Sequence, residues 1–511
     1  MNVPRIASLG AVAAAALGAV VLASGSLLID SAPTSIDGSP QSAHPSQVQL
    51  ACPSGLVDPF KTTNVATATT WSSLSHTPIS PAPASVTGNG GVIPTALTLA
   101  GQGGGELAGL SAVGCAAPRT SQWIATGATT SGADMVLILS NPGPTASVVS
   151  VDGYGATGPL NAAPRQVTVA AGTTVSVLLA GWFPDENSLA VHVQADGGGI
   201  AAWAQASLMN GEIPQGTTLA SAVVPATTQT ILGVDPSGTS LLRLVAPSGE
   251  AHVSVSVADS DGVHPLGGGQ ATVAEGSTLE MPLDGASKDS TPIALIVTSD
   301  REIVAQTTTI TLGAPWAERA NAWIMRSSAT PATSLTQADI PGRRALESMA
   351  TQVLSASPIR DTSVATDSGV SATRASLLLY APPIDAEDPQ RGSDAQSAAP
   401  APTATPNIWA SPSPAATTAQ SGDQGTAQST GTSPSTPGAL TVSVGGRAVS
   451  IAPGVPTLVE LPEEAAQISA ASPIQAAVVI SADTAVGRMT TTWNVGTEGI
   501  SAVSGSIRTN N

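Results

Sequence analysis

Few side chains in this 511-residue chain could carry acid–base, nucleophilic or metal chemistry. The sequence holds no Gly-x-Ser-x-Gly elbow, no Ser-x-x-Lys motif and no His-Glu-x-x-His motif. No two of the five histidines share a local metal spacing, and they are His44, His76, His192, His252 and His264. His192 and His252 stand in alternating strand patterns, where a surface or half-buried histidine is expected. The sequence therefore predicts no catalysis, no metal and no cofactor.

Three glycine runs and one acidic turn resemble ligand-binding loops only in part. The glycine runs lack the Gly-Lys-Ser/Thr ending of a phosphate loop, and they are Gly103–Gly105, Gly197–Gly199 and Gly267–Gly269. The turn Asp259-Ser260-Asp261-Gly262 opens like a calcium loop but lacks the later glutamate. We interpret all four as loops of a β structure.

Four tryptophans are the best candidates for contacts with a ligand or partner. They lie before the first repeated module described below (Trp123), in its last strand (Trp203), before the third module (Trp323) and in the last strand of that module (Trp493). In a chain with 2% aromatic residues they could stack on sugar rings. The interpretation that we favour is that they fill joints between modules as large apolar anchors.

Only two cysteines are present, Cys52 and Cys115. Both follow the apolar N-terminal segment, and in an exported chain an even pair predicts a disulfide. Closing a loop of this length would stabilise the fold by about 4 kcal/mol in the chain-entropy model.

Three copies of one strand-rich pattern organise the chain. Gly172 and Asp196 of the first copy are 24 residues apart, as are Gly276 and Asp300 of the second. The third copy begins near Ser376 and resumes at Leu440 after an insertion, and we align its Asp483 with the two aspartates. Within each copy, Val alternates with Ser or Thr, which is typical of half-buried strands, and glycine turns separate them.

This pattern predicts an all-β protein of three tandem Ig-like β-sandwich modules after one N-terminal transmembrane helix, with a β-propeller as the alternative. The expected order is a signal anchor (1–29), a stalk (30–50), a disulfide-tied β subdomain (51–122), module one (123–225), module two (226–327), a connector with a short helix at 343–354 (328–372) and module three (373–511). The insertion at 385–437, rich in Ala, Pro, Ser and Thr, is expected to be disordered.

The N-terminus predicts the compartment. Residues 6–29 carry no charge and follow Arg5, which is typical of an export signal and long enough to span a bilayer. The continuation through Leu27, Leu28 and Ile29 favours an uncleaved anchor, whereas Ala23 and Gly25 leave a cleaved, secreted form open. The formal charge of −18, with charged residues at 10% of the chain, excludes a nucleic-acid partner.

The export signal, the cysteine pair, a tryptophan, Leu-Ser-Asn-Pro-Gly (Leu139–Gly143) and Val-Ala-Ala-Gly-Thr-Thr-Val (Val169–Val175) resemble a family of actinobacterial envelope proteins of unknown function. The resemblance covers residues 50–510 and brings no activity or functional residue with it. Together with the repeat, it favours a non-enzymatic structural or interaction role in the cell envelope, with a polysaccharide or an envelope protein as partner. Glycan binding, or hydrolysis of an envelope polysaccharide, is the alternative.

Overall fold

The computed structural model describes residues 41–43, 47–59, 68–90, 92–161, 163–211, 213–287, 291–315, 322–355, 370–383, 438–496 and 503–505. The expected anchor (1–29) and insertion (385–437) lie outside these residues. Contacts divide the chain into two units, residues 1–45 with 501–511 and residues 46–500. In the first unit, β1 (Gln41–Ala43) pairs antiparallel with β30 (Val503–Gly505). No helix in the described ranges is both long and apolar enough to cross a membrane.

The prediction of an all-β protein is confirmed, and the second unit holds nearly all of its strands. The strands of module one form two sheets around one apolar core. Its elements are β7 (Ser121–Ile124), β8 (Ala133–Asn141), β9 (Ser147–Gly155), β10 (Gly158–Pro159), β11 (Arg165–Val169), β12 (Thr173–Leu178), the 3-10 turn η1 (Leu179–Gly181), β13 (Ala190–Ala195), β14 (Ala201–Asn210) and β15 (Ile213–Ser221).

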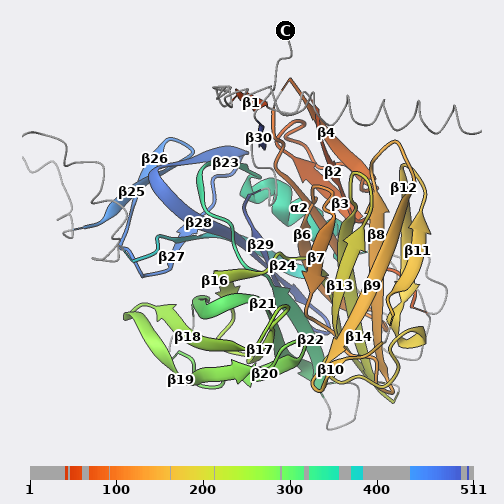
Figure 1. The fold of residues 1–511 in the computed structure, drawn as a ribbon. Coiled ribbons are helices and arrows are strands. Elements are labelled where there is room, and N and C mark those ends of the chain that lie inside the picture. Colours follow the sequence, from red (N-terminus) through yellow and green to blue (C-terminus); the bar gives the residue numbers. More distant parts are fainter. Residues whose placement is uncertain are drawn as a thin grey trace, which may run out of the picture. The chain divides into compact units, whose positions relative to one another are not determined.

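Module two repeats this arrangement, and its sixth strand runs unbroken through both sheets (Figure 1). Valine, leucine and isoleucine side chains from both sheets form its core. Its strands are β16 (Ala226–Val234), β17 (Thr239–Val245), β18 (Ala251–Asp259), β19 (Gly262–Val273), β20 (Thr278–Pro282), β21 (Ile293–Pro315) and β22 (Ala322–Ala329).

The third copy has the same seven-strand pairing, but its first strand lies within the segment 328–372 that the sequence suggested as a connector. The helix α2 (Arg343–Leu354) follows that strand. The strands are β23 (Leu335–Ile340), β24 (Val370–Tyr380), β25 (Leu440–Val444), β26 (Arg447–Ile451), β27 (Thr457–Glu460), β28 (Ala466–Thr484) and β29 (Gly487–Asn494).

The pairing corrects our alignment of the third copy by one strand. The second half of β28 pairs with β24 and β29 as β14 pairs with β8 and β15, so Asp483 does not match the earlier aspartates. Asp196 and Asp300 each accept a backbone N–H from the third strand of their module at 2.8 Å, whereas Asp483 pairs with Arg374 and Arg488. The second half of β28 carries the Val-rich run, and for this reason the sequence repeat was aligned on that half of the strand.

The helix α2 is predicted correctly from sequence, and it is the one α-helix within the described ranges. Leu346, Met349, Ala350 and Val353 recur every three or four residues and are fully buried. They share a core with module three and with Trp71 from the N-terminal segment. The helix therefore joins these two parts of the chain.

The N-terminal segment forms two small sheets, and residues 47–50, which the sequence assigned to the stalk, lie in the first strand. The strands are β2 (Gln47–Ala51), β3 (Ala68–Ser72), β4 (Ser85–Asn89), β5 (Ala96–Gln102) and β6 (Gly109–Gly114). The predicted disulfide between Cys52 and Cys115 is confirmed, with an S–S distance of 2.02 Å.

Candidate functional site

Four strands from the four parts of the second unit contact one another in a closed cycle, β6–β15–β22–β29–β6. Thr217 of β15 donates its N–H to the carbonyl of Ala108 just before β6 (3.0 Å), and Arg326 of β22 donates Nε–H to the carbonyl of Gln215 in β15 (2.7 Å). Ala112 of β6 donates its N–H to Oγ1 of Thr491 in β29 (2.9 Å). The last strands of the three copies thus meet at one place.

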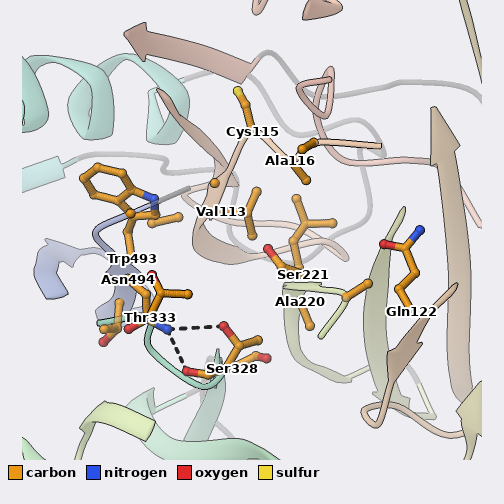
Figure 2. A pocket seen from close by; sticks show the side chains of 18 of the residues that line it. Val113, Cys115, Ala116, Gln122, Ala220, Ser221, Ser328, Thr333, Trp493 and Asn494 are labelled. Carbon is orange, nitrogen blue, oxygen red and sulfur yellow. Dashed lines mark hydrogen bonds between the residues drawn. The ribbon is translucent and has the colours of Figure 1, made fainter. Parts of the chain in front are cut away.

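A small cavity lies at the C-terminal ends of these four strands (Figure 2). Its volume is about 70 Å³, which is room for a few waters but not for a substrate. Ser328 Oγ, Trp493 Nε1 and Asn494 Oδ1 at its wall have no hydrogen-bond partner among the described residues. Asn494 donates Nδ2–H to the carbonyl of Thr330 at 2.6 Å, as the dashed lines show. We expect waters to satisfy the remaining polar atoms.

Aromatic rings pack at the joint between modules one and two. Trp123 is 3% exposed and packs with Val223, Val245 and Val304. Its indole stacks on His192 with ring centroids 4.3 Å apart and an interplanar angle of 9°. Burial lowers the pKa of His192 below 6.5, so this ring is neutral at pH 7. The stack fills the part of the joint around Val223, and a pocket of about 300 Å³ lies elsewhere at the same joint, beside Arg243 and Glu280.

The joint between modules two and three contains a cleft of about 790 Å³. One wall comes from the outer face of β16, β18 and β21, and the other includes Tyr380, Pro383 and Gln475. A volume of this size falls in the range of small-molecule and oligomer sites. We define these residues, with Thr228, Thr230, Ser256, Ile296 and Thr298, as the inter-module cleft.

The two joints differ at corresponding positions on both sides. Trp123 lies opposite the sixth-strand residue His192, and Thr230 lies opposite the matching residue of module two, Ile296. The glutamines just before them, at positions 122 and 229, make the same hydrogen bond to the carbonyl of an isoleucine, at 2.9 and 2.8 Å. On the facing module, the paired residues Tyr380 and Gln475 take the places of the pair Val245 and Val304, so the large side chain of this joint comes from module three.

Two polar atoms in the cleft residues lack a partner within the described part of the chain. They are the hydroxyl of Tyr380, 1% exposed, and Oε1 of Gln475, 7% exposed. Burial raises the pKa of Tyr380 to about 12, so the phenol keeps its proton and remains a hydrogen-bond donor at neutral pH. An unsatisfied buried donor and acceptor cost free energy, which a bound polar ligand or water would recover.

Three of the four tryptophans singled out from sequence are buried where parts of the chain meet. Trp203 of β14 is fully buried against the N-terminal segment and donates Nε1–H to the carbonyl of Gly114 at 3.3 Å. Trp493 of β29 is 2% exposed in the core shared with α2. With Trp123 also buried, none of these three rings offers a face for stacking on a sugar. Trp323 belongs to β22, and its side chain lies outside the described set.

His264 and Asp259 form a local pair in module two. His264 Nε2 lies 3.0 Å from Oδ2 of Asp259, to which Ser287 also donates at 2.7 Å. Desolvation opposes the charged carboxylate, but the hydrogen bonds from His264, Ser287 and the Asp261 N–H lower the pKa of Asp259, and the same bond to His264 raises the pKa of that ring. Asp259 therefore anchors the turn that resembles a calcium loop.

The other suggestive loops also serve the fold. Gly197 and Gly199 adopt positive φ in the turn before β14, and Gly267–Gly269 lie in β19 beside a register shift. No group of three or more potential metal-ligating side chains occurs within the described ranges.

Tyr380, Gln475 and Thr230 line the inter-module cleft and were not predicted from the sequence as site residues. A strand-by-strand comparison of Gln122-Trp123-Ile124 with Gln229-Thr230-Ile231 would have identified Thr230.

A comparison with protein families matches residues 69–380 to DUF5719, a family of unknown function. No curated protein and no solved structure matches the chain significantly. The matched region covers β3 to β24, which includes modules one and two and the Tyr380 side of the cleft. Because it spans more than half of the sequence, this chain belongs to the DUF5719 family.

Proposed function

We propose that this chain is a non-enzymatic, extracytoplasmic interaction protein that holds a partner from the cell envelope in the inter-module cleft. The observation that carries the proposal is the cleft of about 790 Å³ at the joint between modules two and three, which is larger than the pocket of about 300 Å³ at the joint between modules one and two. Hydroxyl and aliphatic side chains line most of it.

The disulfide supports the compartment. A bond between Cys52 and Cys115 is stable outside the cytosol and rare within it. We propose that residues 1–29 anchor the protein in the cell membrane as a single pass, with a secreted form after cleavage as the alternative. The partner is then a cell-wall polysaccharide or an envelope protein, in keeping with the actinobacterial envelope origin that the sequence resemblance implies.

The repeated strand pairing supports Ig-like sandwiches as the building units. Module one places nine strands in two sheets around one core, and module two builds the same arrangement from seven strands. The cycle of β6, β15, β22 and β29 is the feature that the arrangement shares with a propeller. We propose tandem sandwiches whose last strands meet, because the long strands β21 and β28 each take part in both sheets of a module.

A capture experiment with the full chain tests the proposal. Purified protein is incubated separately with cell-wall polysaccharide and with detergent-solubilised membrane proteins, and retention is compared with that of Thr230→Trp. This variant adds a large side chain to the wall of the cleft, at the position that Trp123 occupies in module one, and circular dichroism establishes that it is folded. We expect retention of the wild type on one of the two fractions and at least a tenfold loss for the variant.

The matched control is Thr168→Trp, because Thr168 is exposed on β11, away from the cleft. Retention of this control should equal that of the wild type. Equal retention of Thr230→Trp and wild type would show that the partner binds elsewhere. If a folded wild type is retained on neither fraction, the interaction role is rejected.

A further inference from the structure

The inter-module cleft continues over the outer face of module two. A second, more open hollow of about 600 Å³ lies on the same sheet and shares Thr298 with the cleft. His252 and Asp300 lie in this second hollow. The two hollows together form one elongated surface that runs from Tyr380 to Asp300, which suits an extended ligand better than a compact one.

Polar side chains form a row across this surface. Strand register places Gln270 opposite Ser254, Ser254 opposite Thr298, and Thr298 opposite Thr228, so one residue comes from each of β19, β18, β21 and β16. All four are exposed. Adjacent strands lie about 4.8 Å apart, which is close to the length of one sugar unit in an extended glycan. Hydroxyl and amide groups at this spacing can each donate to and accept from a ligand.

Aliphatic residues lie beside the polar row. The next register row contains Ile296 between Ser256 and Thr230. Val263, which is 41% exposed, and Pro383 also line the cleft. A sugar ring has hydroxyl groups at its rim and C–H groups on its faces, so a surface of hydroxyls next to aliphatic groups matches both parts of the ring.

Charge on this surface is confined to its ends. Arg119 is the one charged residue that lines the cleft, and the other hollow has the pair His252–Asp300, with Nδ1 and Oδ2 3.0 Å apart. The surface between them is uncharged. The formal charge of −18 on the whole chain repels an acidic polymer. These features favour an uncharged ligand.

We propose that the ligand is a neutral polysaccharide, bound along the outer face of β19, β18, β21 and β16, with one end in the cleft at Tyr380 and Gln475. The exposed side chains of Gln270, Ser254, Thr298 and Thr228 supply the hydrogen-bonding groups for the sugar hydroxyls. This assignment rests on the proposed function and adds the chemical class of the partner. It uses hydroxyl and amide side chains and not the tryptophans.

Affinity electrophoresis of the full chain tests the assignment. The protein migrates through native gels that contain a soluble glucan, mannan or galactan, and through one that contains polygalacturonate as an acidic probe. We expect at least one neutral polymer to retard the wild type. Thr298→Val and Ser254→Ala each remove one hydroxyl and should weaken binding about three- to tenfold. Thr168→Val, on exposed β11, is the matched control and should bind like the wild type.

Circular dichroism and thermal unfolding establish that each variant is folded before binding is compared. Retardation by polygalacturonate alone, or by no polymer, overturns the assignment, as does equal retardation of wild type and both sheet variants. If no neutral polymer binds while membrane proteins still retain the wild type better than Thr230→Trp, the polysaccharide assignment fails and the proposed function stands. If neither fraction retains the wild type, both fail.

Discussion

At the scale of single residues, the two joints differ in which side supplies the large side chain. Thr230 occupies the place of Trp123, and the backbone around both positions is held by the same glutamine contact. On the facing module, Tyr380 takes the place of Val245. The sequence alone singled out the tryptophans because they are rare and large, and the structure buries Trp123, Trp203 and Trp493.

The His264–Asp259 pair predicts a pH dependence of stability. The hydrogen bond to Asp259 raises the pKa of His264 above 6.5 in the folded state. Because the folded state holds this proton more tightly, the stabilisation is complete below pH 6.5 and is lost as the pH rises through the raised pKa. Urea unfolding at pH 5, 6.5 and 8 should therefore show a larger decrease for the wild type than for His264→Gln. Parallel curves for the two proteins would contradict this linkage.

At the scale of elements, strand patterns and α2 could be predicted from sequence because each is recorded in local spacing. Period-2 alternation indicated the strands, and the spacing of Leu346, Met349 and Val353 indicated the helix. The register of the third copy could not be predicted, since β28 is one long strand whose Val-rich half attracts the alignment. The contacts between β6, β15, β22 and β29 could not be predicted either, because they depend on which backbones approach closely in space. Glycines permit that approach.

Gly109 tests the contact between β6 and β15. A Cβ atom there would lie 2.1 Å from the carbonyl oxygen of Thr217, so Gly109→Ala must separate the two strands. We expect a loss of about 1–3 kcal/mol in the free energy of unfolding, measured with urea. Gly198→Ala is the control, because its added Cβ meets no atom within 4 Å, and it should change stability by less than about 0.5 kcal/mol. Equal effects of both substitutions would show that the strands are not in close contact.

At the scale of the whole molecule, large aromatic residues hold the parts of the second unit together. Trp203 packs between the N-terminal segment and module one, Trp123 between modules one and two, and Tyr380 between modules two and three. Arg243 of module two also donates to the carbonyls of Gly127 and Leu189 in module one, at 2.7 and 2.9 Å.

Trp123→Thr gives the first joint the residue type that position 230 has in the second joint. Loss of the buried indole is expected to cost about 3–5 kcal/mol in unfolding free energy, since the stack with His192 and the packing against Val223 are removed together. Capture of the envelope partner should remain, because the inter-module cleft is untouched. A variant with unchanged stability, or with lost capture, would contradict the separate roles of the two joints.

The most direct test of the account is a footprint of the cleft. The protein has no free cysteine in the described part of the chain, so Thr228→Cys and, as control, Thr168→Cys each add one exposed thiol. Labelling rates with a fluorescent maleimide are measured with and without the envelope fraction that retains the wild type. We predict that the fraction slows labelling at position 228 at least fivefold and leaves position 168 unchanged. Equal labelling rates at position 228 with and without it would contradict binding in the cleft.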